Sequence, residues 1–83
     1  MNEAQANNVG YWLLGKRRIA EALEVFKMNV EDYPESSNAY DSLAEAYMVN
    51  GDRGLAVINY RKSLELNPRN VNAVEMLKRL RNR

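Results

Sequence analysis

The stretch that decides the fold is residues 37–70, SNAYDSLAEAYMVNGDRGLAVINYRKSLELNPRN, because residues 3–36, EAQANNVGYWLLGKRRIAEALEVFKMNVEDYPES, repeat its pattern. A shift of 34 positions places Pro34 on Pro68. It also superposes residues of like size and polarity: Gly10 with Ala44, Ala22 with Ala56, Leu23 with Val57 and Phe26 with Tyr60. Fixed-period similarity is the signature of a repeat protein. The 83-residue chain is therefore predicted to be one domain with repeats 3–36 and 37–70 and a shorter last segment, 71–83.

Apolar residues within each repeat recur at the spacing of an α-helix face. The first set in each repeat is Ala6, Val9, Gly10, Leu13 and then Tyr40, Leu43, Ala44, Tyr47. The second set is Ile19, Ala22, Leu23, Phe26, Val30 and then Ala56, Val57, Tyr60, Leu64. Each repeat is thus predicted to be a pair of helices. Val74, Leu77 and Leu80 predict a fifth helix that is apolar on one side, so the fold class is all-α.

Turn and cap residues fall between the expected helices. Proline cannot continue a helix, so Pro34 and Pro68 are expected to follow the second helix of each repeat. Ser36 and Asn70 then have the side chains of N-caps for the next helices. Gly51–Asp52 offers a turn followed by another N-cap.

The order of residue types in the repeat resembles the tetratricopeptide repeat, in which a large residue, Leu-Gly, Tyr, Ala, an aromatic residue and Pro follow one another. The second repeat carries this pattern at Tyr40, Leu43, Ala44, Tyr47, Ala56, Tyr60, Ser63 and Pro68. The first carries it at Ala6, Val9, Gly10, Leu13, Ala22, Phe26, Asn29 and Pro34, with Arg17 where the second repeat has its turn glycine. Residues 38–47, NAYDSLAEAY, and 62–68, KSLELNP, also resemble repeat tails that follow hydrolase-like domains in some bacterial proteins. This resemblance implies an excised repeat tail or an engineered repeat derived from one.

The resemblance implies a right-handed helix-turn-helix solenoid that acts as a protein-interaction module. Stacked helix pairs bury their apolar faces only against neighbours, so residues 71–83 are expected to form a capping helix. Two and a half repeats lie below the roughly three needed for stability. We therefore expect marginal stability or pairing into a homodimer, and a self-associating or designed scaffold is the alternative function.

The family resemblance also places a concave groove along the first helix of each repeat. The residues predicted to line this peptide-binding groove are Asn7, Tyr11, Asn38, Asp41, Glu45, Met48, Asn72, Glu75 and Arg79. Ala4, Leu14 and Asn82 complete the same grid. Asparagine amides can pair with a peptide backbone and the carboxylates favour a basic, extended guest. The alternative is that Asp41, Glu45 and Glu75 are only the solvated faces of amphipathic helices.

Composition argues against catalysis. With no Cys and no His, the chain lacks thiol nucleophiles, imidazole bases and the usual zinc ligands. Asp41 and Glu45, one helical turn apart, form a carboxylate pair without a partner nucleophile. The glycines do not form a phosphate-binding loop. We expect no enzyme activity, no cofactor and no metal.

Charge and hydropathy bear on the partners. Net charge is +1, but residues 61–83 carry seven bases and two acids. Phosphate or RNA contact by this basic end, with Lys78, Arg79, Arg81 and Arg83, is the weaker alternative to a helix-dipole role. No long apolar run and no secretory leader is present, which predicts no membrane partner and a cytoplasmic location. Trp12 lies off the apolar stripe, either as an interface anchor or packed under the first helical turn.

Overall fold

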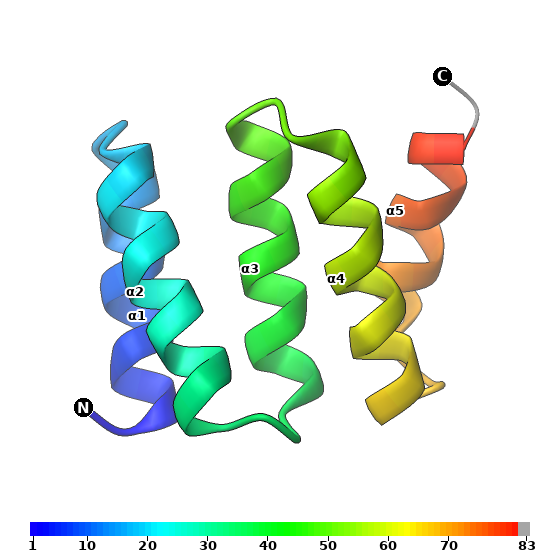
Figure 1. Ribbon diagram of the computed structural model, residues 1–83, viewed down its shortest axis with the longest axis horizontal. Helices are drawn as coiled ribbons and strands as arrows, with labels where there is room; N and C mark the ends of the chain where they lie inside the picture. The colour runs from blue at the N-terminus through cyan, green and yellow to red at the C-terminus, as the bar shows by residue number, and fades with distance from the viewer. Residues whose placement is uncertain (82–83) are drawn as a thin grey trace.

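A computed structural model describes residues 1–81 and is all-helical (Figure 1). Its helices are α1 (Glu3–Gly15), α2 (Ile19–Asp32), α3 (Ser37–Val49), α4 (Arg53–Leu66) and α5 (Val71–Arg81). No β-strand occurs in this part of the chain. The predicted all-α class with five helices is confirmed. Asn82 and Arg83, which the sequence placed in the groove grid and at the basic end, lie outside the described residues.

Consecutive helices pack side by side along the molecule. Contacts join α1 to α2, α2 to α3, α3 to α4 and α4 to α5, and α1 also contacts α3. The result is two helical hairpins and one last helix in a row, with the N-terminus and α5 at opposite ends (Figure 1). This packing is consistent with a helical repeat.

The helices that open each unit begin with side-chain caps spaced 34 residues apart. Asn2 accepts a hydrogen bond from the Gln5 amide at 2.8 Å. Ser36 accepts one from the Ala39 amide at 3.0 Å, and Asn70 accepts one from the Ala73 amide at 3.2 Å. The predicted caps Ser36 and Asn70 are therefore confirmed.

The prediction for Asp52 is only half right. Asp52 stands at the N-cap position of α4, but its side chain makes no capping hydrogen bond. Its carboxylate instead accepts from the Asn50 amide at 2.8 Å. The carboxylate is therefore engaged within the turn itself and does not cap the α4 amides.

The turns inside the two hairpins share one backbone geometry. Arg17 and Gly51 both have positive φ, 63° and 87°. In each turn the next amide donates to a carbonyl five residues back, Arg18 to Leu13 and Asp52 to Tyr47, at 2.9 Å in both. This is the Schellman ending of a helix, in which a left-handed residue lets the chain reverse.

The core is built from the repeat residues. Phe26 and Ala22 of α2 are 0% exposed, and their counterparts Tyr60 and Ala56 are 1% and 0% exposed. A Cβ on Gly10 would lie 2.3 Å from the Phe26 ring, so only glycine lets α1 and α2 approach this closely.

Two apolar residues of α1 are exposed, and for Val9 this contradicts the prediction. Val9, predicted on the core face, is 38% exposed, and Trp12 is 56% exposed, which rules out packing under the first turn. Their counterparts Leu43 and Ala46 are 4% and 0% exposed. The difference arises because α2 and α4 pack against α3, whereas the corresponding outer side of α1 has no helix before it among residues 1–81.

A buried polar contact also recurs in both hairpins. The Asn29 amide donates to the Glu3 carbonyl at 3.2 Å, and the Ser63 hydroxyl donates to the Ser37 carbonyl at 2.8 Å. Both acceptors belong to the first residue of the preceding helix. In each hairpin this hydrogen bond joins the last turns of the second helix to the first residue of the first helix. The two repeats therefore share a buried hydrogen bond as well as their apolar residues.

Candidate functional site

The first helices of the three units present two adjoining hollows. The larger, about 650 Å³, is lined by Tyr11, Ser37, Asn38, Asp41, Glu45, Asn67, Arg69, Asn70, Val71 and Asn72. The smaller, about 320 Å³, is lined by Glu45, Met48, Val49, Tyr60, Asn72 and Met76. Glu45 and Asn72 line both, so the hollows meet between α3 and α5. We call this combined surface the polar groove.

The polar groove gathers six of the nine residues that the sequence proposed. Tyr11, Asn38, Asp41, Glu45 and Asn72 line its larger hollow, and Met48 lines the smaller one. Asn7, Glu75 and Arg79 line neither hollow. Asn7 is turned into the α1–α3 contact, where its side-chain oxygen accepts from the Ser42 hydroxyl at 2.5 Å. The helix-face grid therefore located the α3 portion of the groove better than its α5 portion.

Tyr11 and Glu45 connect the first two repeats within the groove. The Tyr11 hydroxyl donates to Glu45 Oε1 at 2.9 Å. Burial, chiefly, raises the pKa of Tyr11 to about 12, and the nearby Glu45 carboxylate adds to that shift. Burial also raises the pKa of Tyr60, which lies beneath the smaller hollow. Both phenols are therefore neutral at physiological pH.

Asp41 organises the other end of the groove. Its carboxylate accepts from the Asn72 amide at 2.9 and 3.2 Å and from the Asn70 amide at 2.7 Å. Asn70 is also the N-cap of α5, so Asp41 fixes where α5 begins relative to α3. Asn38, by contrast, is exposed and lines the larger hollow. Asn38 is thus accessible to a guest, whereas Asp41 already has partners.

The turn between α4 and α5 contributes residues that the sequence analysis did not place in the groove. Asn67, Arg69 and Asn70 line the larger hollow. Helix-face periodicity could not find them because they precede the helix. The available signal was the cap at Asn70, which brings the turn against the start of α3. Arg69 adds a cation to a surface that the helices alone make acidic.

Neither a metal cluster nor a membrane-spanning helix is found in the part of the chain that the structure describes. No three acidic side chains of residues 1–81 converge as metal ligands would. None of the five helices combines the length and apolarity needed to cross a membrane.

No protein-family model matches the sequence. No curated protein matches it either.

Proposed function

We propose that the protein is a non-catalytic interaction module of the tetratricopeptide kind, a right-handed helical solenoid that binds an extended peptide in the polar groove. Support for the repeat comes from contacts that recur at a spacing of 34 residues: the caps, the turns and the buried Asn29 and Ser63 bonds. Helix content alone would not produce these regularities. Two unrelated helical hairpins need not have the same cap, the same turn and the same buried hydrogen bond at equivalent positions.

The observation that carries peptide binding is the mixed lining of the larger hollow. It offers the Asn38 amide and the Glu45 carboxylate, one oxygen of which accepts from Tyr11, within one concave surface. Amides can donate to and accept from a peptide backbone, and carboxylates select basic side chains. An extended peptide exposes its backbone groups for such contacts, whereas a helix has used them internally.

Selection from a displayed library of random peptides tests this function. We expect enriched peptides to be basic and to bind the protein but not a variant carrying Asn38→Ala and Glu45→Gln. Glu24→Gln, an exposed carboxylate change on α2 outside the groove, serves as the matched control. Peptides that bind all three proteins equally, or no enrichment, would reject the polar groove as the binding surface.

Self-association is a second candidate, and exposed apolar residues on α1 favour it. Val9 and Trp12, three residues apart and 38% and 56% exposed, lie on the outer side of α1. Lys16 lies over the Trp12 ring at 5.7 Å. Sedimentation at increasing concentration should show association that Trp12→Ala weakens. A monomer at every concentration would dismiss this candidate.

RNA contact by the basic end stays a prediction.

A further inference from the structure

The last helix, α5, has an open side that the other opening helices do not have. Among the described residues, α1 has the hairpin partner α2 and α3 has α4, whereas α5 packs mainly on α4 and has no hairpin partner of its own. The exposed fractions follow this difference. Leu23 and Leu43 are 9% and 4% exposed, but their counterparts 34 positions later, Val57 and Leu77, are only half-buried. An apolar surface therefore remains uncovered between α4 and α5.

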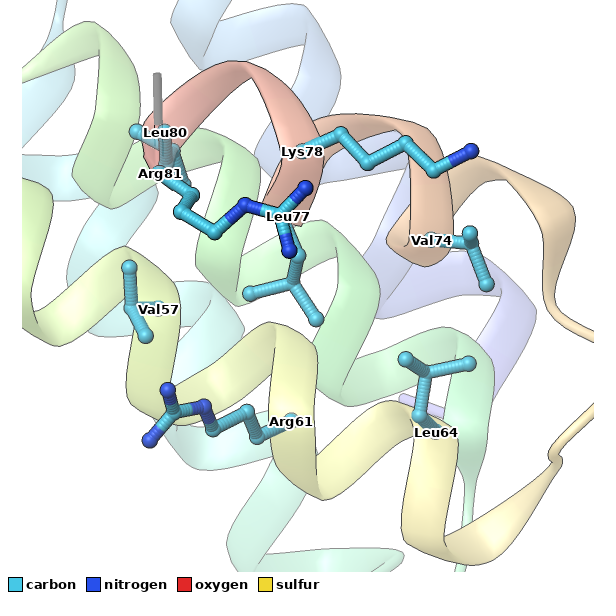
Figure 2. A pocket seen from close by; sticks show the side chains of 8 residues that line it. All are labelled: Val57, Arg61, Leu64, Val74, Leu77, Lys78, Leu80 and Arg81. Carbon is cyan, nitrogen blue, oxygen red and sulfur yellow. The ribbon is translucent and has the colours of Figure 1, made fainter. Parts of the chain in front are cut away.

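This surface is a groove of about 440 Å³, which we call the α4–α5 groove (Figure 2). Its lining is Val57, Arg61, Leu64, Val74, Leu77, Lys78, Leu80 and Arg81. The residues of each helix recur at spacings of three and four, so each side of the groove is one stripe about two helical turns, or roughly 10 Å, long. Leu77 points from α5 towards α4 (Figure 2). The floor is aliphatic along its whole length.

The rim of the α4–α5 groove is entirely cationic. Arg61, Lys78 and Arg81 are exposed, and no acidic residue lines the groove. Within residues 1–81 none of the three forms an ion pair. Three exposed cations around an aliphatic floor attract a guest with both carboxylates and apolar side chains.

Repeat register shows that the rim is specific to α5. Lys78 stands where α1 has Gly10 and α3 has Ala44, both buried beneath a hairpin partner. Arg81 stands where those helices have Leu13 and Tyr47. A helix like α2, which places Phe26 against Gly10, would meet the Lys78 side chain in this position. The groove is therefore unsuited to a partner helix that places a large apolar residue opposite Lys78, as α2 places Phe26 opposite Gly10.

We propose that the α4–α5 groove binds an acidic amphipathic α-helix of another protein. The guest is helical because this face of α5 corresponds to the faces of α1 and α3 that α2 and α4 cover. Its apolar stripe lies on the aliphatic floor, and carboxylates on both flanks pair with Arg61 on one side and with Lys78 and Arg81 on the other. This site is separate from the polar groove and shares no residue with it.

A second copy of the chain is a poorer guest. Its acidic amphipathic helix is α2, with Glu21, Glu24, Glu31 and Asp32. The apolar face of α2 is already buried, since Leu23 is 9% and Phe26 0% exposed. Offering that face to another molecule would open the first hairpin.

Fluorescence anisotropy with a labelled synthetic helix tests the proposal on the full chain. The probe is a capped peptide of about 18 residues, long enough to populate a helix, with leucines at spacings of three and four flanked by glutamates. One comparison peptide replaces each glutamate by lysine, and another scrambles the order to abolish the apolar stripe. We expect the acidic helix to bind and both comparison peptides to bind at least about tenfold more weakly.

Single substitutions then locate the binding site. Arg61→Gln and Lys78→Gln are each expected to raise the dissociation constant of the acidic probe about two- to fivefold, typical of partly exposed charge pairs. The matched control is Lys27→Gln, because Lys27 occupies on α2 the repeat position that Arg61 occupies on α4. Lys27→Gln should leave binding unchanged. All three side chains are exposed, so the variants keep their fold.

Several results would overturn the proposal. Equal binding of the acidic and scrambled peptides would show that only charge is recognised. Equal effects of Lys27→Gln and Arg61→Gln would place binding elsewhere. Dimerisation that Arg61→Gln and Lys78→Gln abolish would make a second copy the occupant. The variant carrying Asn38→Ala and Glu45→Gln separates this proposal from the proposed function. It should lose binding of basic peptides to the polar groove and still bind the acidic helix.

Discussion

The Tyr11 hydroxyl of α1 donates a 2.9 Å hydrogen bond to the Glu45 carboxylate of α3, and the two residues occupy the same position in successive repeats. The Tyr11 ring also packs edge-on against Phe26, with 5.2 Å between ring centroids. Tyr11 therefore contacts both α2, the hairpin partner of its own helix, and α3 of the next repeat. Its polar end lies in the polar groove. Packing between repeats and the candidate binding surface share this residue.

The first prediction concerns the alkaline titration of Tyr11. Its pKa is raised from an ordinary 10.0 to about 12, so the folded state holds the proton over a pH range in which the unfolded state loses it. Stability from this source is complete below pH 10 and is lost as the pH rises towards 12. We expect the free energy of unfolding, measured by urea denaturation, to fall across that range.

Tyr11→Phe provides the control for this titration. The variant keeps the buried ring but cannot ionise, so its stability should decline less steeply above pH 10, with the rest of the decline from Tyr60. Subtracting the alkaline tyrosinate absorbance of the variant from that of the parent isolates Tyr11. A midpoint near pH 10 would mean that Tyr11 is not buried as described.

The second prediction concerns the closest helix approach. A Cβ added at Gly10 would lie 2.3 Å from the Phe26 ring, too close for any relaxed contact. Gly10→Ala should therefore lower the free energy of unfolding by about 1–3 kcal/mol, the usual cost of overpacking a core. Urea denaturation measures this change.

Gly54→Ala is the matched control for Gly10→Ala. A methyl group added at Gly54, in α4, would have no other side chain within 4 Å. Alanine there should stabilise the protein by about 0.5–1 kcal/mol through helix propensity. If both substitutions shifted stability in the same direction, the close α1–α2 packing would be wrong.

Sequence periodicity was sufficient to predict the helices because each one repeats its apolar spacing and its punctuation. Ser36 and Asn70 stand where caps are needed, and α2 and α4 end two residues before Pro34 and Pro68. Asp52 shows the limit of such reasoning. Its residue type suits an N-cap, but a neighbouring amide, that of Asn50, takes its carboxylate first.

The candidate site was predictable only in part, because a grid of helix positions carries no information about side-chain pairing. Tyr11 and Glu45 were placed in one row of the grid, and they are hydrogen-bonded to each other. The grid could not show that Asp41 is engaged by Asn70 and Asn72. It also missed Arg69, which enters the groove from a turn. Those features depend on how α5 docks, which local spacing does not specify.

The third prediction concerns the two left-handed turn residues. Arg17 has φ 63°, a region that costs a residue with a Cβ roughly 1–2 kcal/mol, whereas its counterpart Gly51, at φ 87°, avoids that cost. Arg17→Gly should therefore raise the thermal midpoint, with a gain of up to about 1 kcal/mol. Gly51→Ala should lower the thermal midpoint, with a loss of free energy of unfolding of similar size.

The opposite signs of these two changes are the decisive feature. Arg17 is exposed and Gly51 has no side chain, so neither residue supports the core and the two substitutions differ in their effect on backbone conformation. A stability loss in Arg17→Gly as large as that in Gly51→Ala would show that Arg17 makes a stabilising side-chain contact. Thermal unfolding followed by circular dichroism supplies the comparison.

The fourth prediction concerns Ser63, which joins α3, α4 and the start of α5. Its buried hydroxyl donates to the Ser37 carbonyl and accepts from the Asn70 amide, both at 2.8 Å. Ser63→Ala removes both hydrogen bonds at once, leaves the Ser37 carbonyl and the Asn70 amide without this partner, and should cost about 1–3 kcal/mol. Asn59→Ala, on the same helix and at a side chain that donates to the Leu55 carbonyl within its own helix, should change stability by less than about 0.5 kcal/mol.

Hydrogen exchange distinguishes a local from a uniform effect of Ser63→Ala. Asn70 loses one of the contacts that hold it where it caps α5, so amides in α5 should lose more protection than amides in α1. Because the Asp41 and Asn72 pairing also depends on where α5 begins, the polar groove should loosen with it. An equal loss of protection in α1 and α5 would mean that Ser63 supports the core alone and does not position the groove.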